Sequence, residues 1–508
     1  HEMSIPARAL HIPITRSAPR RLAAALAVPF PVWYGSLLAL AIAVWTLSLQ
    51  NIDLRQINDL GLVSVLPPTF YAAVAVVCLA FCLALRREPL SSTALVISIL
   101  VLIVMLYGAA SVIEPEARFQ ATYKHIGIAQ HIMQYGTVDP NIDAYFNWPV
   151  FFIWAALLSQ VAGLASPLVL ANWTPVVLNA MYLVPLLLIF RAGTSNHRVV
   201  WVAMWFFFVS NWIGQDYFSP QGLNFFLYLA VLAVLLTWFK TPSLVAMADS
   251  GSRRLRLHQR LGSFVHEVRT ARPETANSPS NAWTRVGLLG IVVLVFGFSV
   301  ASHQLTPFAI LMSVGALVLF KRLQLRGLPV LMLVMISAWL IFMAAAFLSG
   351  HLGDMVSQVG DLSQSVGQNV GARLMGSPEH LFIVRIRMVM TLALGVVAAF
   401  GVLARLRQRR FDLILALLAL APFPMMALQP YGGEMLLRAY LFALAPMAFF
   451  AAALFFPRIE SRASVFKLAG IGAVSLALIG GFVLARYGNE RMDYMTTQEI
   501  DGIKQLDA

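Results

Sequence analysis

The longest polar segment in the first 238 residues runs from Ser111 to Trp148, between two long apolar runs. It contains two histidines, three tyrosines and six charged side chains, which are Glu114, Glu116, Arg118, Lys124, Asp139 and Asp143. Carboxylates in a shielded site can take the proton of a sugar hydroxyl, and arginines can bind a phosphate through paired hydrogen bonds. The segment therefore predicts group transfer between a phosphorylated donor and a hydroxyl-bearing acceptor.

Four later groups of polar residues interrupt or flank apolar runs, where an ionisable side chain is costly and is a functional candidate by default. They are Asp216 within the segment 215–221, His303 with Gln304, Arg385 with Arg387, and Tyr431 with Glu434 and Arg438. The topology that follows from the charges places all four on the same side of the membrane as the segment 111–148. One cavity opening at that side is the simplest arrangement that unites them.

Composition indicates the elements that must position these residues. The 508 residues are 59% hydrophobic and 12% charged, with a mean hydropathy of +0.76, whereas soluble domains are roughly 45–50% apolar and about 25% charged. Since a spanning helix needs about 20 apolar residues, we predict an all-α polytopic membrane protein with about thirteen spans. The predicted spans are 24–49, 66–85, 91–113, 172–190, 199–214, 221–239, 286–302, 307–320, 328–349, 381–402, 411–429, 435–456 and 466–485.

The run 148–164 is also apolar, and the positions of lysine and arginine decide its placement. These residues mark the cytoplasmic side of membrane proteins. Most of the 36 cations precede the first span or lie in alternate connections, and the segment 240–285 alone holds eight. All these segments share one side only if 148–164 does not cross. We therefore predict a re-entrant or interfacial helix at 148–164, a cytoplasmic N-terminus and an external C-terminus.

This topology divides the chain into four parts. An N-terminal membrane half, 1–239, carries the outer loop 114–147, and a flexible basic cytoplasmic linker, 240–285, follows it. A C-terminal membrane half, 286–485, carries a second outer loop, 350–378, in which apolar residues recur every three or four positions and predict an amphipathic helix. The residues 486–508 form an external tail. The net charge of +13 is then an orientation signal with attraction for anionic membrane lipids, and it argues against nucleic-acid binding.

Short motifs around the first outer loop resemble those of a known superfamily. The segment Glu114–Phe119 resembles the acidic-x-Arg-Tyr pattern of aminoarabinose and mannosyl transferases, and Asn147-Trp148-Pro149 at the start of an apolar run resembles their continuation. Asp216 falls where these enzymes often place a second external acid. Tyr123-Lys124-His125, paired with the Asn-Trp-Pro motif, resembles actinobacterial members. The chain thus resembles the integral-membrane glycosyltransferases of the GT-C superfamily.

The resemblance implies an inverting transfer of a sugar from a polyprenyl-phosphate donor to a cell-envelope glycan or lipid acceptor, at the outer face of a bacterial plasma membrane. The expected catalytic residues are Glu114, Glu116 and Asp216. The expected donor-phosphate ligands are Arg118, Arg385, Arg387 and Arg438. The expected substrate-binding residues are Tyr123, Lys124, His125, Trp148, His303, Gln304, Tyr431 and Glu434. No particular cofactor is indicated. A divalent metal stays open, because Phe218 occupies the last position of a would-be Asp-x-Asp motif.

Each candidate residue also has a structural interpretation. Glu114 and Glu116 can stabilise a helix N-terminus through its dipole, and Asp139 and Asp143 fit ordinary turns. The arginines can extend along the bundle to reach the membrane interface, and Trp148 and Trp154 fit interface anchors. A packed polar residue is the structural interpretation of His125.

Three other functions stay open at the sequence level. A transporter or lipid flippase typically shows inverted repeats and ionisable groups near the membrane midplane, but the polar groups here gather at one side. A glycan polymerase or ligase of another membrane fold would share the same outer-face chemistry, and a non-catalytic scaffold would not depend on the charges. The sequence leaves open the sugar, the acceptor, the linkage and the oligomeric state.

Overall fold

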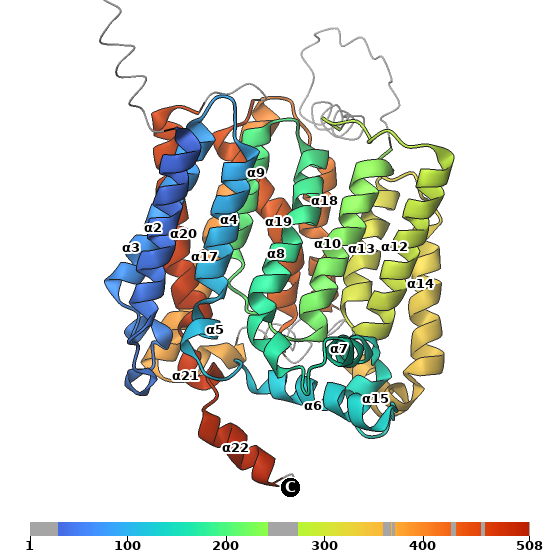
Figure 1. Cartoon of the computed structure of the whole chain (residues 1–508). Helices are drawn as coiled ribbons and strands as arrows, with labels where there is room; N and C mark the ends of the chain where they lie inside the picture. Colours follow the sequence, from blue (N-terminus) through green and yellow to red (C-terminus); the bar gives the residue numbers. More distant parts are fainter. Residues whose placement is uncertain are drawn as a thin grey trace, which may run out of the picture.

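The computed structural model describes residues 29–241, 273–358, 367, 371–427, 433–458 and 463–506. Within them the chain is a bundle of roughly parallel and antiparallel helices without a β-strand (Figure 1). The long helices of the N-terminal half are α2 (Phe30–Leu49), α3 (Pro68–Arg86), α4 (Ser92–Tyr107), α8 (Leu168–Gly193), α9 (His197–Ser210) and α10 (Pro220–Trp238). Those of the C-terminal half are α12 (Ala282–Ser302), α13 (Thr306–Leu319), α14 (Leu328–Ala338), α17 (Pro378–Arg407), α18 (Leu413–Leu420), α19 (Met435–Phe455) and α20 (Val465–Tyr487).

Each of the thirteen predicted spans overlaps one of these helices. Eight helices in the described residues are long and apolar enough to cross a membrane, namely α2, α3, α8, α10, α12, α17, α19 and α20. The apolar helices in the other five ranges are shorter, and α14 continues through a π-helical turn, η4 (Trp339–Met343). The prediction of an all-α polytopic membrane protein is confirmed.

Local sequence explains where several of these helices begin. Proline occupies one of the first two positions of α3, α10 and α17, where its missing N–H costs no helical hydrogen bond. A serine side chain precedes α4, α10, α17 and α20 and accepts a hydrogen bond from a backbone N–H of the first turn. These caps set the ends of the helices and therefore the loops between them, which carry the polar residues.

The helices α9, α10 and α19 form the centre of the bundle. In the apolar windows of α19 and α10, 83% and 72% of the residues are buried, against 22% in α17. Every residue of α9 from Val199 to Ser210 is buried. The polar residues that precede or begin α10 and α19 are therefore placed at one end of the protein interior.

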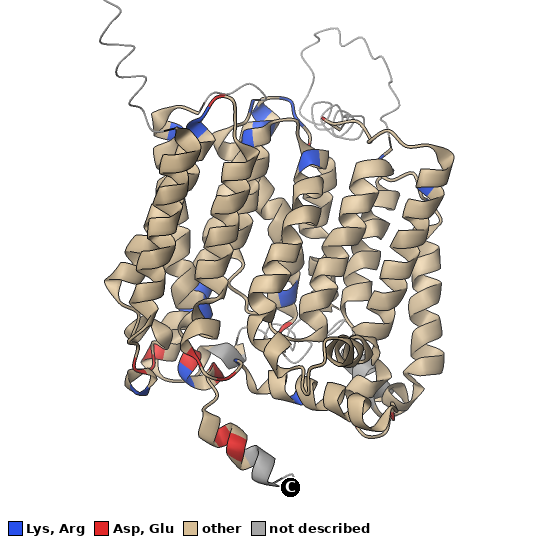
Figure 2. Cartoon of the chain, viewed as in Figure 1, with Lys and Arg blue, Asp and Glu red and all other residues tan. Residues whose placement is uncertain are grey.

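The two ends of the bundle differ in charge (Figure 2). Lysine and arginine gather at the upper edge, here called the cationic face, and most acids lie at the lower edge, here called the acidic face. The start of α2 lies at the cationic face, where Arg87 packs over the ring of Phe30. The described chain ends at the acidic face with α22 (Thr497–Leu506) (Figure 1). The start of α2 and the end of the described chain thus lie on opposite faces, which agrees with an odd number of membrane crossings.

Short helices run along the acidic face in Figure 1. They are α5 (Ala109–Ile113), α6 (Gln120–Tyr135), α7 (Val150–Val161), α15 (Ala345–Gln358) and α21 (Glu490–Asp493). In Figure 1, α7 is seen end-on at the acidic face while the long helices run up and down the bundle, so its 12 residues lie across the bundle axis and do not cross it. The amphipathic helix predicted in the loop 350–378 begins within α15. Its apolar positions Val359, Leu362, Val366 and Val370 lie outside the described residues.

Most of the predicted linker 240–285 lies outside the described residues, but its two ends belong to the bundle. The buried Lys240 donates from Nζ to the carbonyls of Ala192 and Thr275 at 2.9 and 3.0 Å. Glu274 accepts from Arg405 and Arg410 at 2.8 and 2.6 Å. These contacts join the two membrane halves at the cationic face.

Candidate functional site

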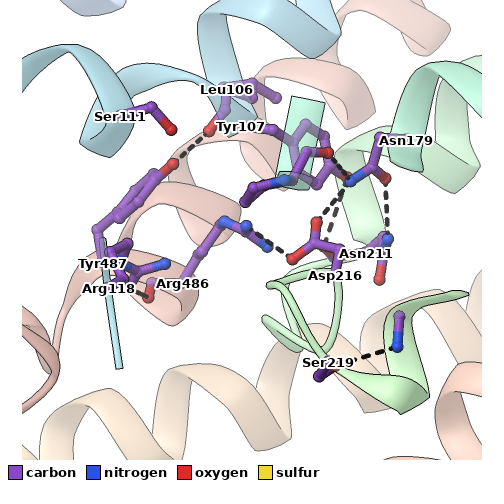
Figure 3. A network of polar contacts seen from close by, with 12 residues as sticks. Leu106, Tyr107, Ser111, Arg118, Asn179, Asn211, Asp216, Ser219, Arg486 and Tyr487 are labelled. Atoms are coloured by element: carbon purple, nitrogen blue, oxygen red, sulfur yellow. Dashed lines mark hydrogen bonds and ion pairs between the residues drawn. The ribbon is translucent and has the colours of Figure 1, made fainter. Parts of the chain in front are cut away.

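The outer loop is fastened to the end of the last long helix by a buried ion pair. Arg118 donates from Nε and Nη2 to the two carboxylate oxygens of Glu490, each at 2.5 Å. The side chains are 8% and 0% exposed. Arg118 Nη2 also donates to the carbonyl of Arg486, as Figure 3 shows. Phe119, at a left-handed φ of 68°, donates its backbone N–H to the carbonyl of Asp493. The polar segment 111–148 therefore has a fixed position against α20 and α21.

Glu114 lies beside this ion pair and is 3% exposed. Its two carboxyl oxygens are buried, and the carboxyl group of Glu490 is close enough to accept a hydrogen bond from the protonated form of Glu114. Burial, followed by the nearby carboxylate of Glu490, raises the pKa of Glu114 well above its usual value, and Arg118 opposes the rise. This environment favours the protonated form of Glu114 over the carboxylate.

Replacing Glu114 with glutamine is expected to stabilise the protein at alkaline pH. Folding raises the pKa of such a carboxyl group above its value in the unfolded chain. The group stabilises the fold most at a pH below its pKa in the unfolded chain, and this contribution is lost as the pH rises towards its pKa in the folded protein. Glutamine cannot ionise, so Glu114→Gln should match the parent near pH 4 and gain stability over it by pH 8. Thermal unfolding in detergent across this range measures the difference. A stability difference that does not change with pH would contradict the raised pKa.

A second buried ion pair holds the loop between α9 and α10. Asp216 accepts from Arg486 Nη2 at 2.8 Å, and the side chains are 3% and 1% exposed. Asn179 of α8 donates to the other oxygen of Asp216 at 2.5 Å and accepts from Asn211 at 3.2 Å. Figure 3 shows Arg486 of α20 and Asn179 of α8 reaching the carboxylate of Asp216 from two sides, with Asn211 behind Asn179. Asp216 is thereby an acceptor in a closed network that anchors the segment 215–221.

The opposite side of the same loop faces a polar cavity of about 50 Å³. Its walls come from α6, the end of η3 (Ala144–Asn147), the α9–α10 loop, α10, the α12–α13 loop and α19. We call it the polar cavity, and its lining residues are His125, Tyr145, Trp148, Tyr217, Ser219, Pro220, Gln221, Ser302, His303, Gln304 and Arg438. Segments that are far apart in the sequence thus build one enclosure at the acidic face.

Two buried histidines line this cavity, and they carry their hydrogen on different ring nitrogens. His125 Nδ1 lies 2.9 Å from the carbonyl of Phe218, and a carbonyl only accepts, so Nδ1 carries the hydrogen. His303 Nδ1 accepts from the backbone N–H of Thr306 at 3.1 Å, so its hydrogen is on Nε2. Burial lowers the pKa of His125 to about 4 and that of His303 well below its usual value. Both rings are neutral at pH 7, and they differ in which nitrogen can accept.

The cationic residue of the polar cavity is Arg438, in the first turn of α19. It is 7% exposed, and its Nη2 donates to Glu434 at 2.7 Å. The N-terminus of a helix carries partial positive charge that adds to the field of the guanidinium. An anion entering the polar cavity would be attracted by both.

The structure gathers five of the residues predicted to bind substrate or donor on the polar cavity, which are His125, Trp148, His303, Gln304 and Arg438. Two more lie at its edge. Glu434 is paired with Arg438, and Lys124 forms an ion pair with Asp143 at 2.8 Å while lying over the ring of Tyr145. The structure therefore brings these seven residues together at one cavity or its edge.

The other predicted site residues lie elsewhere. Arg387 donates from Nε to the carbonyl of Ala485 at 2.8 Å, and Arg385 is exposed on α17. Glu116 accepts from the hydroxyl of Tyr123 at 3.1 Å. None of the predicted catalytic acids, Glu114, Glu116 and Asp216, is among the described residues that line the polar cavity. Tyr431 lies outside the described residues.

Sequence reasoning missed several partners of these residues. Arg486 and Glu490 were assigned to the external tail, yet they are buried counter-ions of Asp216 and Arg118. Their spacing of four residues just after the last apolar run is a helical signal for one face. Asn179 and Asn211 were visible as polar amides inside apolar runs. Tyr145, Tyr217 and Gln221 carried no signal beyond membership of polar segments.

The lining suits an anionic or hydroxyl-bearing ligand. It combines a guanidinium, two imidazoles, amides and hydroxyls, which can donate to phosphate oxygens or pair with sugar hydroxyls. Among the residues that the structure describes, no group of three or more His, Cys, Asp or Glu side chains could hold a metal ion.

The comparisons with known proteins are sparse. No family model matches the chain, and no curated protein matches it. Among solved structures, it is similar to the crystal structure of the Archaeoglobus fulgidus oligosaccharyltransferase tethered to an acceptor peptide through a disulfide bond. The identity is 14%, the match covers 86% of this chain and 57% of that one, and the TM-score is 0.40. A likeness this weak assigns no activity to the chain.

Proposed function

We propose that the chain is a membrane glycosyltransferase, which moves a hexose or pentose from a polyprenyl-phosphate carrier to a hydroxyl of a cell-envelope glycan or lipid. The observation that carries this proposal is the polar cavity, where the buried Arg438 and two neutral histidines meet at the acidic end of an apolar bundle. A guanidinium fits the phosphate that leaves with the carrier, and the neutral polar groups fit a sugar.

The distribution of charge between the two faces of the bundle supports a reaction at the outer side of the membrane. The cationic face carries most lysines and arginines of the described chain, which is the pattern of a cytoplasmic side. The polar cavity lies at the other face, so its substrates would come from the outer leaflet of a bacterial plasma membrane and from the envelope beyond it.

An apolar groove supports a donor with a lipid tail. It has a volume of about 380 Å³ between α17 and α20 and is floored by Phe206 of α9 and Ala451 of α19. The groove ends at Ile386 and Leu484, beside Arg387 and the carbonyl of Ala485 to which Arg387 donates. The α17 wall is the least buried candidate span of the described chain. An isoprenoid chain could enter there from the membrane and keep its phosphate near the acidic face.

The proposed reaction is an inverting displacement at the anomeric carbon. The acceptor oxygen attacks this carbon, the bond to the phosphate oxygen breaks, and the electron pair leaves with the polyprenyl phosphate. Arg438 would stabilise the charge that develops on the leaving phosphate, and Arg387 would hold it while the lipid lies in the groove. We propose that Arg118 and Asp216 act indirectly, by fixing the loops that shape the polar cavity.

Replacing Arg438 with glutamine is expected to reduce transfer by roughly 100- to 1,000-fold, the loss seen when one electrostatic contact to a transition state is removed. The assay uses purified protein in liposomes, polyprenyl phosphates carrying a radiolabelled hexose or pentose, and an envelope extract as acceptor. Arg491→Gln is the matched control, because Arg491 is 64% exposed at the same face and pairs with Asp59.

Two results would contradict the proposal. Transfer by Arg438→Gln at the rate of Arg491→Gln would remove the phosphate role of the polar cavity. Translocation of the labelled lipid across the liposome membrane without any glycosidic product would instead make the chain a flippase.

A further inference from the structure

We propose that His125 is the catalytic base, which takes the proton of the acceptor hydroxyl through Nε2. The inference rests on the transfer reaction proposed above and goes beyond it, because sequence analysis assigned the base to an acid and His125 only to substrate binding. Four observations carry it. They are the tautomer of His125, the burial of its Nε2, its place on the wall of the polar cavity, and the position of the predicted acids outside that cavity.

The fold fixes the tautomer of His125. Phe218 lies between Asp216, which is held by Arg486 and Asn179, and Ser219, which caps α10. Its carbonyl is therefore placed by two anchored neighbours, and it accepts from Nδ1 at 2.9 Å. Nε2 is then the nitrogen with the lone pair. A proton arriving at Nε2 would leave the bond from Nδ1 to Phe218 intact.

Nε2 is an unused acceptor in a buried place. His125 is 1% exposed, and Nε2 has no hydrogen-bond partner among the described residues. Buried polar atoms nearly always have a partner, so this lone pair, on a residue that lines the polar cavity, is available to a donor such as the hydroxyl of a substrate. A hydroxyl of the acceptor supplies the missing donor.

The ring is also held in orientation by aromatic neighbours. Tyr217 stacks on it at a centroid distance of 5.7 Å, and Tyr145 meets it edge-on at 5.1 Å. The charged and titratable groups around it are Lys124, Asp143, Tyr145, Tyr217, His303 and Arg438. A packed ring with a fixed tautomer needs little reorganisation when the proton arrives.

The proton balance of the step is complete. The acceptor O–H bond breaks as its oxygen bonds to the anomeric carbon, and the proton goes to Nε2 while the electron pair of the broken C–O bond leaves on the phosphate. His125 becomes an imidazolium that returns the proton to water after the products leave. Burial lowers the pKa of His125 to about 4, close to that of a carboxylate base. The donor phosphate, once bound, would raise it.

The predicted acids are less suited to this step. Asp216 is engaged by Arg486 and Asn179, and Glu114 is buried beside Glu490 with a raised pKa. Glu116 accepts from the hydroxyl of Tyr123, and none of the three acids lines the polar cavity in the described chain. His125 and Arg438 both do, so the groups for the incoming hydroxyl and the leaving phosphate share one enclosure.

The decisive variant is His125→Asn. The asparagine amide can still donate to the carbonyl of Phe218 from the position of Nδ1, but nothing replaces Nε2. In the liposome assay described above we expect a loss of roughly 10²- to 10⁴-fold in kcat, with donor KM and the thermal unfolding temperature near those of the parent. Added imidazole should partly restore transfer to His125→Ala.

The outcomes separate this inference from the proposed function. If the parent transfers sugar and Arg438→Gln does not, but His125→Asn keeps at least half of the parent kcat, the function stands and His125 is not the base. If donor KM rises while kcat is kept, His125 only binds substrate, and the inference is also overturned. If the parent transfers no sugar from any donor, the proposed function and this inference fail together.

A measurement on the parent protein covers the case in which the variants do not fold. With ¹⁵N-labelled histidine, NMR distinguishes a protonated Nδ1 and a bare Nε2 from the opposite tautomer. We expect the resonances of His125 to show the bare Nε2 at pH 7. A hydrogen on Nε2 at that pH would overturn the inference.

Discussion

Replacing Asp216 with alanine is expected to lower the free energy of unfolding by about 3–5 kcal/mol, the range for breaking a buried ion pair. The variant would leave the guanidinium of Arg486, 1% exposed on its side chain, without its carboxylate. It would also remove the acceptor of the Asn179 amide. Both groups would stay buried in an apolar bundle, where an unpaired charge is most unfavourable. Thermal or denaturant unfolding in detergent measures the loss.

The pair of Asp59 and Arg491 provides a matched control for this experiment. It has a comparable N–O distance, 2.6 Å, but its side chains are 43% and 64% exposed. Exposed pairs contribute roughly 0.2–1 kcal/mol, so Asp59→Ala should change stability by no more than that. The double variant Asp216→Leu with Arg486→Met should recover much of the loss, because it leaves no buried charge. Equal losses in Asp216→Ala and Asp59→Ala would show that burial of the pair has no energetic role.

Replacing Gly401 with alanine is expected to destabilise the protein by at least about 1–3 kcal/mol, the usual effect of overpacking a core. Gly401 lies where α17 packs against α19. A Cβ added there would sit 1.8 Å from the carbonyl oxygen of Phe450. The obstacle is backbone, which cannot rotate away as a side chain can, so the two helices would have to separate. Because α19 carries Arg438, transfer should fall together with stability.

Gly395, two turns earlier on the same helix, is the control. A Cβ at Gly395 would meet only Met447 Cε at 4.0 Å, an ordinary contact. Alanine is intrinsically better than glycine in a helix by up to about 1 kcal/mol, so Gly395→Ala should be neutral or stabilising. If Gly401→Ala unfolds at the same temperature as Gly395→Ala, the close contact between α17 and α19 does not exist in the protein.

Much of the architecture could be predicted because the bilayer imposes strict rules on a sequence. A span must be apolar over about 20 residues, and its flanking charges must suit the side on which they lie. Both are properties of contiguous residues. They sufficed for the thirteen helical ranges, and they placed the segment 111–148 and His303, Glu434 and Arg438 at one face.

The pairing of charges could not be predicted, because partners in a helical bundle are chosen by packing and not by proximity in the chain. Glu490 lies 372 residues from Arg118, and Arg486 lies 270 from Asp216. The sequence showed each acid or arginine as a free chemical group. The structure made Arg118 and Asp216 members of buried ion pairs, which changes their chemistry from candidate reactants to anchors.

The segment 111–148 shows the same division. By itself the sequence determined that this stretch is polar and interfacial, because hydrophobicity and charge are local properties of the side chains. Only the tertiary structure decided that Glu114 is buried and that His125 turns one nitrogen to Phe218 and lines a cavity with Arg438. Burial, tautomer and pKa depend on neighbours contributed by other helices. The chemistry of a membrane site is therefore set by which helices meet there, even when its residues are already visible in the chain.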